Sequence, residues 1–228
     1  QQYWDHKYIR VLVDQEVPAL GYTTVVLYEK GLDSYPVYLQ PNEQVSRCYD
    51  DVVLENEQTI VTISAETGRI KSLVDKTTGQ ELIGEGKEAG LVYQETECKT
   101  SSAWNIGRAI KNVPVDRCVE LGRAVIGELR SSVTAHFTVE NSTAEVTYVL
   151  EKDQPLVRVE LKVDWKEIGK DIIPVLTWQT PLSYQTDAFR YDVPAGSTVR
   201  RGINNDVPGL RYGMALRMDG SSAILVSD

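Results

Sequence analysis

The chain has 228 residues and a formal net charge of −9, with 42% of its residues hydrophobic and 25% charged. These fractions are typical of folded globular proteins and exclude collagen-like and disordered chains, and no apolar run approaches the roughly 20 residues of a membrane-spanning helix. The acidic balance argues against nucleic acid, because binding the phosphate backbone requires clustered Lys and Arg, so neither nucleic acid nor a membrane is expected as a partner.

Residues 1–47 differ in pattern from the rest of the chain. Two short apolar runs, 11–13 and 24–27, lie on either side of the sequence VPALGY, and a proline-containing stretch follows. We predict an arm or a small β-unit over residues 1–47 and the main domain over residues 48–228. The chain starts without a methionine and ends on the apolar run 223–226, which has the pattern of a strand without a partner. We therefore expect a piece of a longer protein, truncated at the C-terminal end of this domain.

The stretch TISAETGRIKSLVDKTTGQELI, residues 62–83, contains the pair Thr-Gly twice, at 67–68 and at 78–79. Each pair lies between short runs of β-branched and aliphatic residues. Glycine adopts positive φ at little steric cost, and a polar stretch that ends in glycine between two extended runs is typical of a chain reversal within a sheet. The stretch therefore predicts three strands joined by two turns.

Residues 119–139 carry the clearest alternation in the sequence. A helix over 118–130 is disfavoured, because Gly122 and Gly127 would each cost about 1 kcal/mol in a helix interior. We expect strands with one buried and one exposed face, and Gly122 at a turn or bulge. The apolar positions that share one parity are Val119, Leu121, Val125, Leu129, Val133, Ala135, Phe137 and Val139.

Further alternating runs follow towards the end of the chain. A reversal at 152–155 leads into a half-buried strand over 157–165. Residues 189–193 and 210–218 alternate in the same way, and Asp219-Gly220 predicts a hairpin before the final run. No segment shows a long amphipathic helix. Strands that recur about every 8 to 14 residues predict an all-β fold, with two antiparallel sheets packed face to face.

Residues suited to hydrolytic metal chemistry are scarce. A catalytic zinc site needs three protein ligands from His, Cys, Asp or Glu and one open position, but the only histidines, His6 and His136, lie in unrelated contexts. Cys48, Cys98 and Cys118 are widely separated and form no C-x-x-C pair, so reduced thiols are expected. The sequence predicts neither a metal site nor a cofactor within the chain. The sequence does not decide whether two carboxylates are paired for glycoside hydrolysis, because the 33 acidic residues give many pairs.

One aromatic residue is a candidate for contact with a ligand. Trp165 and Trp178 lie at apolar strand positions and are expected in the core. Trp104 instead lies in SSAWNIGR, among small and polar residues outside the alternating segments. Beside Asn105 and Arg108, it is placed to face a ligand in a loop. The structural alternative is a loop tryptophan that caps the edge of the sandwich.

A family resemblance rests on the four stretches VPALGYTTVVL, VLENEQTIVTISAETGRIKSLVDKTTGQEL, SAWNIGR and LVRVELKVDWKE. In this order and at this spacing they resemble the β-domain that follows the catalytic domain in α-mannosidases of glycoside hydrolase family 38. The likeness runs from about Val17 to Asp228, and residues 54–82 carry most of its specificity. It implies a large two-layer antiparallel β-sandwich of the galactose-mutarotase-like, or supersandwich, type.

The resemblance also implies a division of labour in the parent protein. In that family the zinc-binding His-x-Asp motif and the carboxylate nucleophile belong to an upstream α/β domain, so no catalytic residue carries over to this chain. The expected reaction is retaining hydrolysis of terminal α-mannosides by that catalytic domain, with zinc as its cofactor. This chain is then expected to be inactive by itself, to scaffold the catalytic domain, and to wall its cleft with Trp104, Asn105 and Arg108.

The sequence is also consistent with other functions. The chain could be an independent carbohydrate-binding module for mannosides or other oligosaccharides, which should show several exposed aromatic residues on one face. It could also be a structural domain that stabilises a homo-oligomer. A β-galactosidase domain or an aldose epimerase would share the architecture, although an epimerase needs a histidine and an acid placed for acid–base catalysis. The thiols favour a bacterial, cytoplasmic source.

Overall fold

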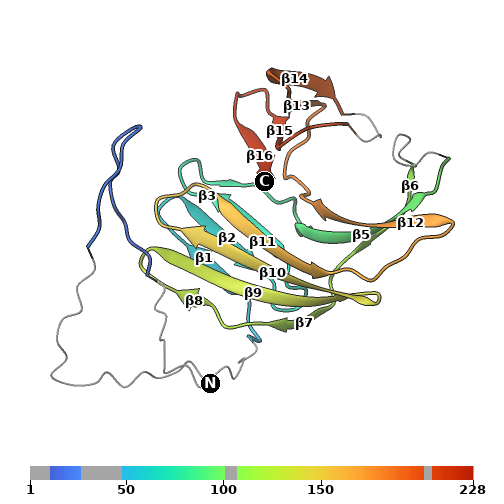
Figure 1. Ribbon diagram of the computed structural model, residues 1–228, viewed down its shortest axis with the longest axis horizontal. Coiled ribbons are helices and arrows are strands. Elements are labelled where there is room, and N and C mark those ends of the chain that lie inside the picture. Colours follow the sequence, from blue (N-terminus) through green and yellow to red (C-terminus); the bar gives the residue numbers. More distant parts are fainter. Residues whose placement is uncertain (1–10, 27–47, 101–106, 203–206, 228) are drawn as a thin grey trace, which may run out of the picture.

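The computed structural model describes residues 11–26, 48–100, 107–202 and 207–227, and Figure 1 shows their arrangement. These residues form sixteen β-strands and no helix, so the predicted all-β class is confirmed for them. The strands fall into four antiparallel sheets. None of the described residues belongs to a helix that is long and apolar enough to cross a membrane.

Two of the sheets pack together as a sandwich, because side chains from both meet in one buried cluster. The first has the order β1-β2-β3-β4, with the bounds β1 (Val52–Glu55), β2 (Thr59–Ile63), β3 (Ile70–Asp75) and β4 (Gln80–Glu81). The second has the order β11-β10-β9-β7, with β8 also paired to β9, and its bounds are β7 (Cys118–Leu121), β8 (Val125–Ile126), β9 (Arg130–Val139), β10 (Ser142–Glu151) and β11 (Val157–Asp164).

Two smaller sheets adjoin this sandwich (Figure 1). The third sheet has the order β12-β5-β6, with the bounds β5 (Gly90–Glu97), β6 (Ala109–Pro114) and β12 (Ile172–Gln179). The fourth sheet has the order β14-β13-β15-β16, with the bounds β13 (Ala188–Val193), β14 (Gly196–Arg201), β15 (Tyr212–Leu216) and β16 (Ser222–Val226).

The two Thr-Gly turns lie where the sequence predicts them. β2 pairs with β3 and β3 pairs with β4, both antiparallel. Gly68 and Gly79 have φ angles of 67° and 70°, in the left-handed region that disfavours residues with a Cβ. The predicted hairpin before the final strand is also confirmed, with Gly220 at a φ of 86° between β15 and β16.

Alternate residues of the sandwich strands form the core. Strands β9 and β10 pair in register over their whole length, so their inward side chains lie side by side. Each fully buried aliphatic or aromatic side chain contributes about 1.5–3 kcal/mol to folding. The buried apolar residues at these alternate positions of β1, β2, β9 and β10 are Val52, Leu54, Val61, Ile63, Val133, Ala135, Phe137, Val139, Ala144, Val146, Tyr148 and Leu150.

The single apolar face predicted for residues 119–139 is correct in β9 but wrong at Val119 and Val125, which are 54% and 68% exposed. The register between β7 and β9 shifts between Cys118 and Glu120, so Val119 is an extra residue in a bulge. A bulge reverses which parity faces the core. Cys118 therefore packs against the core. The bulge lies at Val119, three residues before Gly122, where the sequence analysis expected a turn or bulge.

The edge strand β11 is covered by the sandwich over only part of its length. Its inward residues Val157 and Val159 pack against the core, whereas Leu161 and Val163 are exposed. Trp165 and Trp178 are partly buried and also pack against the core, as predicted. The half-buried face expected over 157–165 is thus confirmed at both ends of this range, whereas its middle positions are exposed to solvent.

A buried arginine joins the sandwich to the β12-β5-β6 sheet. Arg69, which follows the turn at Gly68, is 4% exposed, and its Nη1 and Nη2 atoms donate to the carbonyls of Leu91 (2.6 Å) and Glu88 (3.0 Å). Burial lowers the pKa of Arg69, and the nearby Glu88 carboxylate opposes this effect. Tyr148 donates from its hydroxyl to the Gly68 carbonyl over 2.8 Å, and burial raises its pKa. The turn is therefore held from both sides.

We predict that Gly68→Ala destabilises the protein more than Gly79→Ala does. A Cβ at Gly68 would lie 2.8 Å from both Cys118 Sγ and Phe137 Cζ, whereas a Cβ at Gly79 would meet no atom within 4 Å. The left-handed backbone alone costs an L-residue about 1–2 kcal/mol, and overpacking adds about 1–3 kcal/mol at Gly68. Urea unfolding of both variants measures the difference, and equal losses would show that the space beside Gly68 adjusts freely.

Candidate functional site

Arg108 is the member of the predicted trio that the structure describes, whereas Trp104 and Asn105 lie outside the described residues. It directly precedes β6, and its side chain is 78% exposed. Its Nη2 donates to Glu97 Oε1 over 2.9 Å, and its Nε and backbone N–H lie 3.4 Å from Oε2. These hydrogen bonds lower the pKa of Glu97 and raise that of Arg108. Both groups therefore carry their charge at neutral pH.

A bulge between β5 and β6 places Arg108 opposite Glu97. Glu95 pairs with Lys111, but the next residue, Thr96, pairs with Ala109, so that Ile110 is the extra residue. Without this shift the parity of Arg108 would direct it to the other face of the sheet. The bulge is therefore what brings the arginine to the face that carries the two glutamates.

A second ion pair follows on the same face. Lys111 Nζ lies 2.8 Å from Glu95 Oε1 and 5.7 Å from the centre of the Tyr93 ring. The hydrogen bond with Glu95 raises the pKa of Lys111. We call Glu95, Glu97, Arg108 and Lys111 the rim. The sequence analysis singled out only Arg108 of these four, because neither the pairing of β5 with β6 nor the bulge leaves a periodic signal.

The chemistry of the rim suits binding better than proton transfer. Its carboxylates accept hydrogen bonds and its cations donate them, and such groups at fixed positions can bind the hydroxyls of a sugar. A general acid needs a pKa near the working pH, whereas the pKa of Glu97 is lowered by Arg108. The rim therefore offers no proton donor at Glu97.

Two shallow depressions on the described surface lie away from Arg108. One has a volume of about 300 Å³ at one end of the sandwich, and its lining includes Glu55, Lys76 and Arg130. The other has a volume of about 570 Å³ and lies on β7, β9, β10 and β11, with His136 and Glu145 in its lining. Each lining contains an ion pair, Lys76 with Glu55 in the first and Lys162 with Glu145 in the second.

His136 lies opposite Glu145 in the β9–β10 register. Glu145 accepts a hydrogen bond of 2.7 Å from Lys162, which lowers the Glu145 pKa. His6 lies outside the described residues. Within the part of the chain that the structure describes, no three His, Cys, Asp or Glu side chains are grouped as metal ligands. None of the three cysteines is in a disulfide.

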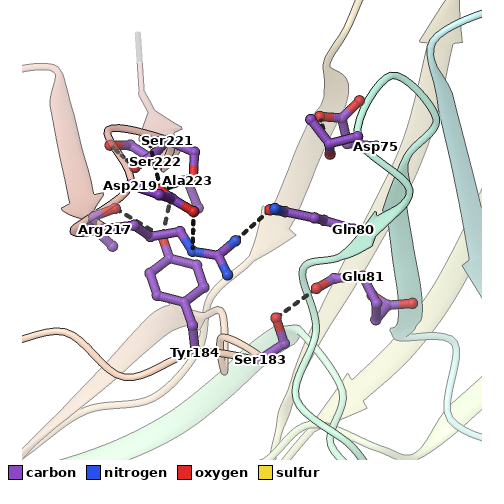
Figure 2. Close-up of polar contacts among 12 residues, drawn as sticks. Asp75, Gln80, Glu81, Ser183, Tyr184, Arg217, Asp219, Ser221, Ser222 and Ala223 are labelled. Carbon is purple, nitrogen blue, oxygen red and sulfur yellow. Dashed lines mark hydrogen bonds and ion pairs between the residues drawn. The ribbon is translucent and has the colours of Figure 1, made fainter.

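A polar joint fixes the β13–β16 sheet to the β3–β4 hairpin (Figure 2). The Tyr184 hydroxyl donates to the Ala215 carbonyl over 2.8 Å and accepts from the Ala223 N–H over 3.0 Å, so it bridges β15 and β16. The Arg217 guanidinium lies 4.4 Å from the Tyr184 ring centre, and its Nη1 donates to the side chain of Gln80. The Ser183 hydroxyl donates to the Glu81 carbonyl over 2.5 Å.

We predict that Glu81 stabilises the fold in a pH-dependent way. Burial raises its pKa, but hydrogen bonds to its carboxylate from Ser72, Leu73 and Ile83 outweigh burial, and the net pKa is lowered. A lowered pKa in the folded state contributes stability above the unfolded pKa of about 4.3, and this contribution disappears as the pH falls through the folded pKa.

The measurement is urea unfolding of the wild type and of Glu81→Gln between pH 7 and pH 3. The wild type should be the more stable at pH 7, and the difference should shrink steadily below about pH 4.5. A difference that stays constant down to pH 3 would mean that the charge on Glu81 adds nothing to the hydrogen bonds.

A sequence model described as the glycosyl hydrolases family 38 C-terminal domain matches residues 54–209, more than half of the chain. The chain belongs to this family. A search of curated proteins finds no match. The matched residues run from β1 to beyond β14 and include the whole rim. The resemblance seen in the sequence is confirmed for the domain, while residues 11–26 and strands β15 and β16 lie outside the match.

Proposed function

We propose that this family 38 domain is the non-catalytic β-sandwich of an α-mannosidase, which scaffolds the upstream catalytic domain and walls its substrate cleft. The observation that carries the proposal is the family match, because it spans both sandwich sheets and the rim. The partners are then the catalytic domain of the same polypeptide and mannosides or oligosaccharides. The arrangement supports a scaffold physically, since a large buried core holds the edge residues in fixed positions.

In this proposal Arg108 acts on the sugar by binding. Trp104 and Asn105 precede it by a few residues in the sequence SSAWNIGR, and a tryptophan ring offers an apolar face on which a sugar ring stacks. Glu97 limits the rotation of the Arg108 side chain through two hydrogen bonds. Such a restraint lowers the entropy that is lost when the guanidinium contacts a hydroxyl.

The zinc ion is assigned to the catalytic domain. The described residues of this chain do not group three ligands in one place, and the rim holds its two carboxylates in ion pairs with Arg108 and Lys111. These residues therefore do not fit a zinc site. The metal would supply Lewis-acid chemistry to sugar hydrolysis in the domain upstream.

The proposal predicts that Arg108→Ala and Trp104→Ala, each in the full-length polypeptide, raise KM for a mannoside several-fold while kcat changes little. Loss of an interaction made equally in the ground state and the transition state has this signature. The matched control is Lys162→Ala, which removes an exposed ion pair between β11 and β10 that is not part of the rim. If the Arg108→Ala and Trp104→Ala enzymes both have the KM of the control, the proposal of a cleft wall loses its support.

A second candidate, an independent carbohydrate-binding module, is favoured by one observation. Phe189 and Tyr191 lie on the same face of β13, partly exposed, with ring centres 6.5 Å apart and planes inclined by 27°. Two aromatic rings in a row are a platform on which sugar rings stack. Gly202, Gly209 and Gly213 lie against these rings and place no side chain beside them.

The two candidates differ in what the chain binds alone. If it is a scaffold, titration of the 228-residue chain with mannosides in a calorimeter should give no measurable heat of binding. If it is a binding module, the titration should give a saturable curve, and Tyr191→Ala should abolish it. Saturable binding that Tyr191→Ala removes would therefore replace the first proposal with the second.

A further inference from the structure

One face of β5 leads from the core of the sandwich out to the rim. Alternate residues of a strand share a side of the sheet. On this side of β5 they are Leu91, Tyr93, Glu95 and Glu97. The exposed fraction rises along the face, from 3% at Leu91 and 8% at Tyr93 to 29% at the Glu97 side chain. Tyr93 and Glu97 are about 13 Å apart along the strand, which is longer than one pyranose ring.

The neighbouring strand β12 adds apolar side chains to this face. Pro174 lies opposite Glu95 and Ile172 lies opposite Glu97, and both apolar residues are partly buried. Residues that lie opposite each other in antiparallel strands point to the same side of the sheet. The face therefore combines apolar groups with a few fixed polar groups, which is the usual composition of a ligand site.

The hydroxyl of Tyr93 lies among charged groups on this face. Burial raises its pKa, and the carboxylates of Glu95, Glu140 and Glu167 raise it further. The Lys111 ammonium opposes these effects. The hydroxyl is therefore close to three acceptors that come from separate segments of the chain.

This hydroxyl has no hydrogen-bond partner among the residues that the structure describes. In the same residues every fully buried polar side-chain atom has a partner, so the Tyr93 oxygen reaches the surface although its ring is buried. A tyrosine hydroxyl both donates and accepts hydrogen bonds, whereas a carboxylate only accepts them. A sugar hydroxyl placed between Tyr93 and Glu95 would satisfy both, because it accepts one hydrogen bond and donates another.

Trp165 supplies a stacking surface beside this hydroxyl. Its ring centre lies 6.4 Å from that of Tyr93, with the planes inclined by 36°, and its side chain is partly exposed. The next two residues fix its position, since the Lys166 N–H donates to Ser142 Oγ over 2.9 Å and Glu167 accepts from the same hydroxyl over 2.8 Å. A ring that is held in place before a ligand arrives loses little entropy on binding.

We propose that this face holds a second sugar subsite, formed by Tyr93, Glu95, Lys111 and Trp165. The sugar ring stacks on the Trp165 ring, and its hydroxyls contact the three polar side chains. The subsite lies beside Arg108 on the same face and within the residues that match the family. The inference rests on the proposed function and narrows its substrate class to oligosaccharides, because a single mannose would leave the subsite empty.

The first test compares substrates with one and three sugar units in the full-length polypeptide. α-Mannosyl fluoride has one ring and no further sugar, whereas mannotriose extends past the terminal mannose, and its α-linkage is the one that the wild type cleaves fastest. Tyr93→Phe should raise the ratio of the KM for mannotriose to the KM for the fluoride about fivefold, because one hydrogen bond to the longer substrate is lost.

The matched control is Tyr49→Phe, which removes the hydroxyl of a tyrosine that is 85% exposed before β1. Its ratio of KM values should equal that of the wild type. A Tyr93→Phe ratio that also equals the wild-type ratio would overturn the subsite. The two proposals fail separately, since the cleft wall is tested by the KM of Arg108→Ala and Trp104→Ala and the subsite by the Tyr93→Phe ratio.

The second test asks whether the Tyr93 hydroxyl has a partner inside the protein. In urea unfolding of the 228-residue chain, Tyr93→Phe should keep the wild-type midpoint or raise it, because a hydroxyl without a protein partner adds nothing to folding. Tyr148→Phe should lower the midpoint, since the buried Tyr148 hydroxyl donates to the Gly68 carbonyl over 2.8 Å. Equal losses in both variants would mean that the Tyr93 hydroxyl is bonded within the fold, and would overturn the subsite.

Discussion

The buried guanidinium of Arg69 is the interaction on which the arrangement of sheets depends. A charged group is expensive to bury unless its donors are satisfied, and here two donors bind the carbonyls of Leu91 and Glu88. These carbonyls adjoin or belong to β5, whereas Arg69 follows a turn of the sandwich. Gly90 provides the space for the Arg69 side chain, since a Cβ at position 90 would lie 3.0 Å from Arg69 Cγ. The position of β5 is thereby tied to the turn that Tyr148 anchors in the core.

The position of the rim depends on this contact between Arg69 and β5. β5 carries Glu95 and Glu97, and their partners on β6 are reached only through the bulge at Ile110. Four charged side chains consequently lie on one face in two ion pairs, at the edge of a sheet whose other end is fixed to the core. Exposed ion pairs contribute little to stability. The fold therefore depends little on the two ion pairs of the rim, which suits a cleft wall on a rigid support.

Period-two alternation and the glycine turns were enough to determine the strand class, the turns at Gly68 and Gly79 and the core of β9 and β10, because these depend on neighbours in the sequence. The sequence of residues 54–82 also carried most of the resemblance to the family. Only the tertiary structure decided that Val119 is exposed, that Arg108 meets Glu97, and that Arg69 rather than an apolar residue links two sheets. Bulges and contacts between residues distant in sequence leave no periodic trace, since one extra residue reverses a face without changing composition.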